Sequence, residues 1–251
     1  MPDAKNGIIT QYLDAIKNIL DAVAETQAEP MERAAQLLAD AIKNRRSVFT
    51  FGSNHAGILA QELYYRTGGL AVVNYIRAPG VSLDVDPPTL TTDMERLPGY
   101  GRHIADANPI GEGDVVIVHS VSGRNSVPID FAVRSKEKGA SAICLCNMTT
   151  SSQVGSRHIS GKNLFQVCDV VIDNCGHYGD GVLTLEGFPE KVAPSSTAVG
   201  AAILNAVIAR AVELLLAGGV TPPVFISSNV PGGDAHNERI MREYSGQIHY
   251  L

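Results

Sequence analysis

The sequence predicts an α/β domain in which a mainly parallel β-sheet is covered by helices on both faces. Two observations lead to this fold class. Short runs of apolar and β-branched residues recur along the chain, and they alternate with segments whose apolar residues have helical spacing. The strand-like runs are apolar throughout instead of alternating with polar residues, which is typical of strands buried on both faces of a parallel sheet.

The elements are expected in the following order. Two amphipathic helices, 8–20 and 30–44, precede the first strand, with Pro30 at a position where a helix does not need its N–H. Strands are expected at 47–51, 70–76, 114–119, 141–146 and 165–173, with a further short apolar run at 224–227. Later helices are expected at 58–66, 100–107, 126–138, 194–217 and 237–248, and glycine pairs follow two of them.

One long stretch, residues 77–96, has no clear period and holds three prolines. Irregular stretches of this length inside a compact domain are usually functional or mobile. No internal repeat or low-complexity linker divides the chain. We therefore expect one domain over residues 1–251, with an N-terminal helical extension of about residues 1–46.

Composition excludes several classes of protein. A hydrophobic fraction of 45% with a net charge of -6 does not fit a disordered chain. Tryptophan is absent and aromatics make up 6%, which argues against a stacking surface for single-stranded nucleic acid. With 20 Lys+Arg against 26 Asp+Glu, the chain has no overall basic field for a polyanion. We expect no nucleic-acid partner, whereas a small anion held by local geometry fits.

Neither a signal peptide nor a zinc site is expected. The N-terminus is amphipathic, and the most apolar helix, 194–217, is interrupted by polar and charged residues, so no membrane contact is expected. The cysteines form no CxxC pair and no Cys/His zinc spacing, and they read as small core side chains: Cys144, Cys146, Cys168 and Cys175. These features predict a reduced, cytoplasmic protein.

The first of two polar loops follows the first expected strand, at the sheet edge where ligands bind in open parallel sheets. It reads FGSNHAG, residues 51–57, in which Gly52 permits a tight turn and Ser53 and Asn54 offer polar groups. No Gly-Lys-Ser/Thr follows and the GxGxxG pattern is missing, so the loop is neither a P-loop nor a dinucleotide fingerprint. A binding loop and an ordinary strand–helix turn are equally open interpretations.

The second polar loop, HSVSGRNS, covers residues 119–126 and opens a helix. The free N–H groups at a helix start point outward with partial positive charge and bind phosphate. A plain helix cap needs one Ser or Asn, whereas this loop has four hydroxyl or amide side chains. We expect an anion site made by Ser120, Ser122, Gly123, Arg124, Asn125 and Ser126.

These two loops resemble the sugar isomerase (SIS) domain of phosphosugar isomerases and phosphosugar-binding proteins. The segment SGRNSVP is similar to a loop of N-acetylmuramic acid 6-phosphate etherases, and GYGRHIADANPIGEGD to a region of sedoheptulose 7-phosphate isomerases. The whole chain, from about Asn6 to Leu251, most resembles an uncharacterised bacterial group of phosphosugar-binding SIS proteins. The resemblance implies a flavodoxin-like three-layer αβα sandwich with a five-stranded parallel sheet. It also implies a homodimer or homotetramer, and a sugar phosphate held by SVSGRNS.

Three candidate catalytic residues come from the residues and the resemblance together. SIS isomerases and etherases carry a working glutamate on the helix after the first loop, and Glu62, which falls near that position, is the candidate base. His55 lies seven residues earlier, on the same side of the helix about 10 Å away, as an acid and a base at different sugar atoms require. The alternative for Glu62 is an exposed pair with Arg66. His236 is the third candidate, because some SIS isomerases use a C-terminal histidine for ring opening, sometimes across a subunit boundary; a place at a helix start is its alternative.

Other polar residues leave alternatives open. Ser195 and Ser196 head a long helix and offer a second set of amides and hydroxyls to a sugar, unless one is only the cap. His119 ends a buried strand, where a structural and a ligand-binding role are equally open. Sedoheptulose 7-phosphate isomerases hold a metal with histidines and acids on two helices, but helix 194–217 has no histidine. We expect no metal and no organic cofactor.

The function expected from these features is phosphosugar binding with aldose–ketose isomerisation of a sugar phosphate or amino-sugar phosphate through an enediol. That reaction needs a base that moves a proton between C1 and C2, and donors that hold the developing oxyanion. A non-catalytic phosphosugar sensor is the first alternative. A phosphosugar lyase or deaminase of the etherase type is the second.

Overall fold

One parallel sheet organises the chain, for which a computed structural model describes residues 7–251; residues 1–6 of the expected N-terminal extension lie outside the described part. Five strands are hydrogen-bonded in the order β2-β1-β3-β4-β5, the flavodoxin-like order, and all neighbours are parallel. The strands are β1 (Val48–Gly52), β2 (Val73–Tyr75), β3 (Val115–His119), β4 (Ser141–Cys146) and β5 (Val170–Asp173). The predicted five-stranded parallel sheet is confirmed.

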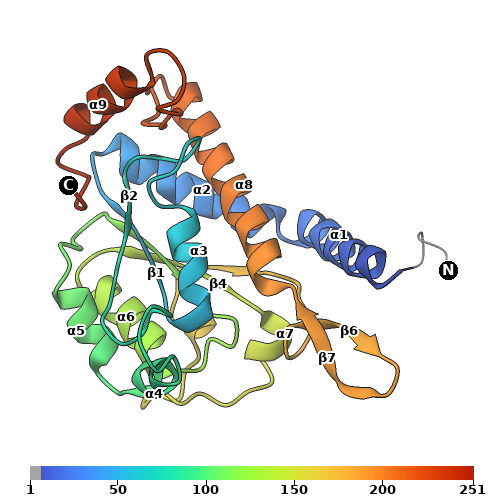
Figure 1. Cartoon of the computed structure of the whole chain (residues 1–251). Helices are drawn as coiled ribbons and strands as arrows, with labels where there is room; N and C mark the ends of the chain where they lie inside the picture. The colour runs from blue at the N-terminus through green and yellow to red at the C-terminus, as the bar shows by residue number, and fades with distance from the viewer. Residues whose placement is uncertain (1–6) are drawn as a thin grey trace.

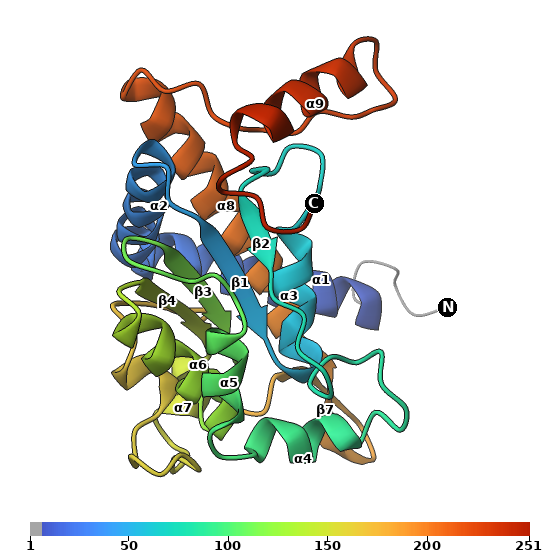
Figure 2. The same ribbon diagram turned by 90° about the vertical axis from the view of Figure 1, so that its left-hand side faces the viewer.

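Helices cover both faces of this sheet and complete the predicted three layers (Figure 1 and Figure 2). One face packs against α2 (Ala28–Lys43), α3 (Gly57–Glu62) and the long α8 (Ser196–Ala217). The other face packs against α5 (Tyr100–Asp106) and α6 (Ser126–Glu137), with α4 (Leu90–Arg96) beside α6. Cys144 and Cys146 lie on β4 and are buried in the core cluster on this second face, as predicted for small core side chains.

The N-terminal helices form where apolar spacing predicted them. Helix α1 (Ile8–Thr26) runs into α2 with one residue between them, and α1 projects from the body of the molecule (Figure 1). Only Ile19 and Val23 of α1 are buried. Most of this helix therefore contributes little to the core.

Two segments differ from the sequence prediction. Residues 77–96 contain helix α4, which the prolines and the missing period concealed. An antiparallel hairpin, β6 (Gly181–Leu185) and β7 (Phe188–Pro194), precedes α8, and Pro194 therefore ends a strand instead of opening the helix. The hairpin was missed because β7 is exposed along most of its length and lacks an apolar pattern.

Several other elements begin or end some residues away from their predicted positions. The fifth expected strand begins with a 3-10 turn, Leu164–Gln166 (η3), and only its last four residues form β5. The last helix, α9 (Gly233–Glu243), begins and ends earlier than expected, and the run at 224–227 contributes only an isolated bridge from Val224 to Leu70. A one-turn helix, α7 (Met148–Ser151), follows β4.

Helix α8 is the one helix within residues 7–251 that is long and apolar enough to cross a membrane by length and composition. Core helices pass the same test. Nine of its residues are buried against the sheet and the neighbouring helices, among them Val199, Ile203 and Val207. Its apolar character is therefore explained in part by packing.

Candidate functional site

The carboxyl ends of β1, β3 and β4 lie side by side, and the two polar loops start there. Gly52 at the end of β1 pairs with His119 at the end of β3, and His119 pairs with Leu145 of β4. A Cβ at Gly52 would lie 2.6 Å from the carbonyl oxygen of Ala56, so glycine is needed for the first loop to fold back this tightly. The first loop is therefore held directly beside the second.

A buried carboxylate joins the two loops. The side-chain amide of Asn54 donates to Oε2 of Glu95 at 2.8 Å, and the amide of Asn125 donates to the same oxygen at 2.7 Å. Glu95 comes from α4 and is 8% exposed. Burial raises the pKa of its carboxyl above the ordinary value, although both amides act in the opposite direction. Residues far apart in the sequence thus meet on one carboxylate.

The start of α6 is not closed by its own cap residue. Asn125 occupies the N-cap position, but its side chain makes no capping hydrogen bond. It donates instead to Glu95 and accepts from Nη1 of Arg157 at 2.9 Å. Gly123, at φ +60°, turns the loop so that its N–H donates to Ser120 Oγ at 3.2 Å. This geometry favours an anion site over a plain helix cap.

Positive charge gathers beside this helix start. The pKa of Arg157 is lowered first by burial and then by the nearby positive charges of Arg124 and Arg96. Nε of Arg124 is buried and has no hydrogen-bond partner among the described residues. The chain carries a net charge of -6, yet three guanidinium groups lie close together here. The loop therefore offers a local cationic field to an anion.

His119 uses only one of its two ring nitrogens. Nδ1 lies 2.9 Å from the carbonyl oxygen of Ala56, and because a carbonyl only accepts, Nδ1 carries the proton. Nε2 is then an acceptor, and it has no partner within residues 7–251. Burial lowers the pKa of His119 to about 4, so the ring is neutral at pH 7.

The start of α8 is occupied by a carboxylate of the chain itself. Asp180 accepts hydrogen bonds from the N–H of Ser195 at 3.1 Å and of Ser196 at 2.8 Å. The Ser196 hydroxyl donates to the second carboxylate oxygen at 2.7 Å. The amides and hydroxyls expected to face a sugar are directed to Asp180.

Glu62 and His55 lie on the predicted segment but not in the network around Glu95. Glu62 pairs with Arg66, and Asn205 of α8 donates to its Oε1 at 3.1 Å. Its side chain is 34% exposed, and His55 is exposed at the surface. The structure thus shows the pair with Arg66 that was the alternative for Glu62.

His236 lies at the other end of the molecule. Its Nε2 is 3.0 Å from the carbonyl oxygen of Val224, and α9 leads into a C-terminal segment in which Gln247 donates to Arg46 O, just before β1. Both views place α9 and α4 at opposite ends (Figure 1 and Figure 2). Within one chain, the structure does not bring His236 to the polar loops.

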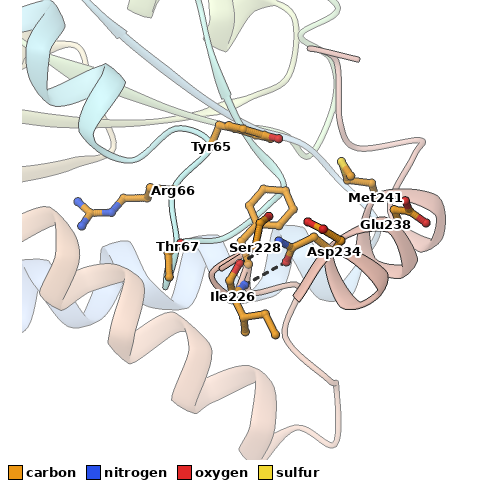
Figure 3. Close-up of a pocket in the computed structure, with 10 residues that line it drawn as sticks. Tyr65, Arg66, Thr67, Ile226, Ser228, Asp234, Glu238 and Met241 are labelled. Atoms are coloured by element: carbon orange, nitrogen blue, oxygen red, sulfur yellow. Dashed lines mark hydrogen bonds between the residues drawn. The ribbon is translucent and has the colours of Figure 1, made fainter. Parts of the chain in front are cut away.

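A cavity of about 320 Å³ lies between the end of α3 and α9 (Figure 3). It contains no residue of the two polar loops. It is lined by Tyr65, Arg66, Thr67, Phe225, Ile226, Ser228, Asp234, Asn237, Glu238 and Met241. Within residues 7–251, no group of three or more His, Cys, Asp or Glu side chains is placed to hold a metal ion.

Comparison with known proteins identifies the family. The sequence profile of the SIS domain matches residues 11–147. The chain belongs to the SIS domain family. A UPF0309 protein of Shouchella clausii is 44% identical over 97% of this chain and 99% of its own length. A UPF0309 protein of Streptomyces avermitilis is 39% identical over 98% and 99%. The resemblance to uncharacterised bacterial SIS proteins is confirmed.

Solved structures of other SIS-fold proteins share the architecture. A phosphoheptose isomerase from Francisella tularensis has a TM-score of 0.51 and 15% identity, over 81% of this chain and 95% of that one. An E. coli CFT073 protein, solved as a complex with a small ligand, has a TM-score of 0.51 and 16% identity, over 85% and 91%. At these identities the likeness shows the fold alone.

Buried polar atoms without a hydrogen-bond partner concentrate at the carboxyl edge of this SIS sheet. Eight such side-chain atoms occur within residues 7–251, and five lie at the ends of β1, β3 and β5 or on the loops that follow. Each costs about 1 to 3 kcal/mol if it stays unpaired, so such a cluster points to a ligand site. The five are Ser53 Oγ, Asn54 Oδ1, His119 Nε2, Arg124 Nε and Asn174 Nδ2.

Sequence reasoning missed four residues of this region: Glu95, Arg157, Asn174 and Asp180. Glu95 lies inside the irregular stretch 77–96, so only its neighbourhood was marked as functional. Asn174 directly follows β5 and could have been found by the same edge rule that selected the loops after β1 and β3. Arg157 and Asp180 reach the region through loop folding that no local pattern reports.

Replacing Glu95 by glutamine removes a buried charge but keeps an oxygen that accepts from both asparagine amides. Because the pKa of Glu95 is raised in the folded chain, its contribution to stability is fully present below pH 4.5 and is lost as the pH rises through the folded value. We expect Glu95→Gln to have a higher free energy of unfolding than the native protein at pH 7. The difference should shrink as the pH falls toward 4.5, as urea unfolding at several pH values would show.

The exposed Glu186, in the turn between β6 and β7, gives a matched control. Glu186→Gln should leave the free energy of unfolding unchanged both at pH 7 and near pH 4.5. A Glu95→Gln protein less stable than the native protein at pH 7 would contradict the account of Glu95 as a destabilising buried charge.

Proposed function

We propose that this SIS domain, as one domain over residues 1–251, binds a sugar phosphate at the β3–α6 loop and interconverts its aldose and ketose forms. The proposal rests on the cluster of unpartnered buried polar atoms at the carboxyl edge, beside an uncapped helix start and three arginines. A phosphate group complements the helix start and the arginines. Sugar hydroxyls complement the neutral donors and acceptors around them.

The phosphate is placed at the start of α6. There the amides of residues 124–126, the half-buried hydroxyl of Ser122 and the guanidinium of Arg124 surround one anion, while the N–H of Gly123 is held by Ser120. Ser120 shapes the loop through its bond to Gly123, and Ser126 Oγ donates to Arg157 O at 3.3 Å. The amides carry most of the recognition, so the net charge of -6 is no obstacle.

Glu95 is the proposed base. Both asparagine amides donate to Oε2, and no described residue donates to Oε1. A carboxyl whose pKa is raised by burial is suited to take and return a proton near neutral pH. The carboxylate removes the proton from C2 of the open aldose, and O1 takes up the proton that O2 gives up as the enediol forms and collapses. The protonated Glu95 carboxyl then returns its proton to C1 as the carbonyl moves to C2.

The candidates drawn from the resemblance take other places in this proposal. His55 stays a candidate for ring opening, and Glu62, which is paired with Arg66, is the alternative base. His236 contributes only if a partner subunit brings it to the loops, because it lies at the opposite end of its own chain. Gly52, Ser53 and Asn54 line the site from the first loop.

The fold neighbours agree with the class of ligand without identifying it. One of them is a phosphoheptose isomerase, an enzyme whose name specifies a phosphorylated sugar. It is under 25% identical to this chain, so experiment has to identify the sugar that this chain binds.

Phosphate binding is tested first. Ser122→Ala removes one hydroxyl from the proposed anion site, and a hydrogen bond to a charged group contributes about 1.5 to 3 kcal/mol. We expect the dissociation constant for inorganic phosphate, measured by calorimetry, to rise roughly 10- to 100-fold. Ser152→Ala, at the exposed end of α7, should leave it unchanged. Equal binding by the native and Ser122→Ala proteins would place the phosphate elsewhere.

Turnover is tested next, by incubating the native protein with aldose and ketose 6-phosphates in deuterated water. Isomerisation through an enediol incorporates deuterium from solvent at C1 or C2, which proton NMR detects. Removal of a general base typically costs 100-fold or more, on the order of 10² to 10⁴. We expect that loss in Glu95→Gln, with phosphate binding retained. If Glu62→Gln loses turnover and Glu95→Gln does not, the base is Glu62.

Two other functions have distinct outcomes in the same experiment. Binding without turnover of any sugar phosphate would identify a phosphosugar sensor. Release of lactate would identify a lyase of the etherase type, and release of ammonia a deaminase.

We propose that the chain assembles as a homodimer or homotetramer through α1. Ile9 is 76% exposed and Leu13 52% exposed on this projecting helix (Figure 1), an apolar surface that favours a partner. Sedimentation should give a mass that is a multiple of 26.6 kDa, and Leu13→Asp should shift it toward the monomer. Asn18→Asp adds the same charge at an exposed polar position of α1 and should not. A monomeric native protein would contradict the proposal.

A further inference from the structure

Three polar side chains at the carboxyl edge are almost completely buried and still have an atom without a hydrogen-bond partner among the described residues. They are Ser53 after β1, His119 at the end of β3 and Asn174 after β5, and each is at most 2% exposed. They come from three strands of one sheet. None of them carries a charge at pH 7, so they suit neutral groups of a ligand instead of its phosphate.

His119 is oriented by its strand and by one hydrogen bond. Val115 and Ile117, on the same side of β3, belong to the core layer shared with α3 and α8, so the ring of His119 points toward these helices. Its Nδ1–H is held by the carbonyl oxygen of Ala56 at the start of α3. The tautomer is therefore set, and Nε2 can act only as an acceptor.

The surroundings of Nε2 are polar. The carboxylate of Asp180 and the imidazole of His55 are near enough to affect the pKa of His119, in opposite directions, but burial outweighs both. The ring therefore stays neutral down to about pH 4. A neutral acceptor pairs only with a donor, and the hydroxyls are the donors that every sugar phosphate carries.

Asn174 lies beside the start of α8. Its Oδ1 accepts from the N–H of Gly176 at 2.9 Å, which leaves its Nδ2 as a donor. A Cβ at Gly176 would lie 3.0 Å from that Oδ1 and 3.3 Å from Ser195 Oγ, so Asn174 and Ser195 flank the same backbone. Asp180 occupies the amides of this helix start and disfavours a second anion there.

We infer that the carbon chain of the ligand lies over the ends of the strands that carry Ser53, His119 and Asn174, and that His119 Nε2 accepts a hydrogen bond from one of its hydroxyls. This inference rests on the proposed sugar-phosphate site and extends it. The ligand class is a monophosphate of a polyhydroxylated chain. A ligand that lacks the hydroxyl leaves a buried acceptor unpaired and binds more weakly.

The test compares three sugar phosphates with inorganic phosphate by calorimetry, on the native protein and on His119→Phe. The probes are fructose 6-phosphate, glucose 6-phosphate and arabinose 5-phosphate. We expect at least one to bind the native protein more tightly than phosphate does. His119→Phe should weaken that sugar phosphate roughly tenfold and leave phosphate binding unchanged. His103→Phe, at an exposed position of α5, should change neither.

A readout on the native protein covers the case in which His119→Phe fails to fold. Nitrogen-15 NMR of labelled histidine should show His119 with a protonated Nδ1 and an unprotonated Nε2. The Nε2 resonance should move when the tightest sugar phosphate is added and stay in place with inorganic phosphate. A protonated Nε2 in the free protein, or a resonance that no bound sugar phosphate moves, would overturn the inference.

The proposed function and the role inferred for His119 can be disproved separately. If neither phosphate nor any sugar phosphate binds, the proposed function falls and the inference falls with it. If sugar phosphates bind only as tightly as phosphate, or bind His119→Phe as they bind the native protein, the inference alone is wrong.

Discussion

The contact on which the candidate site depends is the double hydrogen bond from Asn54 and Asn125 to Oε2 of Glu95. Each asparagine belongs to a different loop, and the sheet alone fixes only where those loops begin. Because one oxygen accepts from both, the two loops and α4 are held in one arrangement. The same contact draws the Asn125 side chain away from the cap of α6, and the helix start stays open to an anion. A buried carboxyl with a raised pKa is the energetic cost of this arrangement.

Two helix starts meet this edge, and the chain treats them differently. At α8 the amides are satisfied by Asp180, whose two oxygens accept from Ser195 and Ser196. At α6 no carboxylate takes that place among the described residues, and Arg124 and Arg157 add positive charge. Helix starts attract anions, so under the proposed function the internal carboxylate at α8 leaves the start of α6 for the phosphate.

The fold was predictable from the sequence because parallel strands buried on both faces leave uninterrupted apolar runs, as DVVIVH and SAICLC do. The polar loops were predictable for the same reason, since the ends of such strands are known once the strands are. The hairpin at Gly181–Pro194 was not, because its residues are largely exposed and carry no apolar period. Glu95 was not predictable as a site residue either: its role depends on α4 folding back onto loops 30 and 41 residues away in the sequence.

Family resemblance predicts Glu62 and His236 as catalytic candidates, whereas burial and hydrogen bonding indicate Glu95 and His119. Glu62 is half-buried and is held by Arg66 and Asn205, outside the network that joins the two polar loops. Glu95 is sealed and linked to both loops, so its protonation depends on what the site contains. Burial also disfavours the charged form of His119, which lowers the pKa of its ring and keeps it neutral. In the proposed site Glu95 would thus exchange a proton, whereas neutral His119 only accepts a hydrogen bond and would keep a substrate hydroxyl oriented while the carboxyl acts.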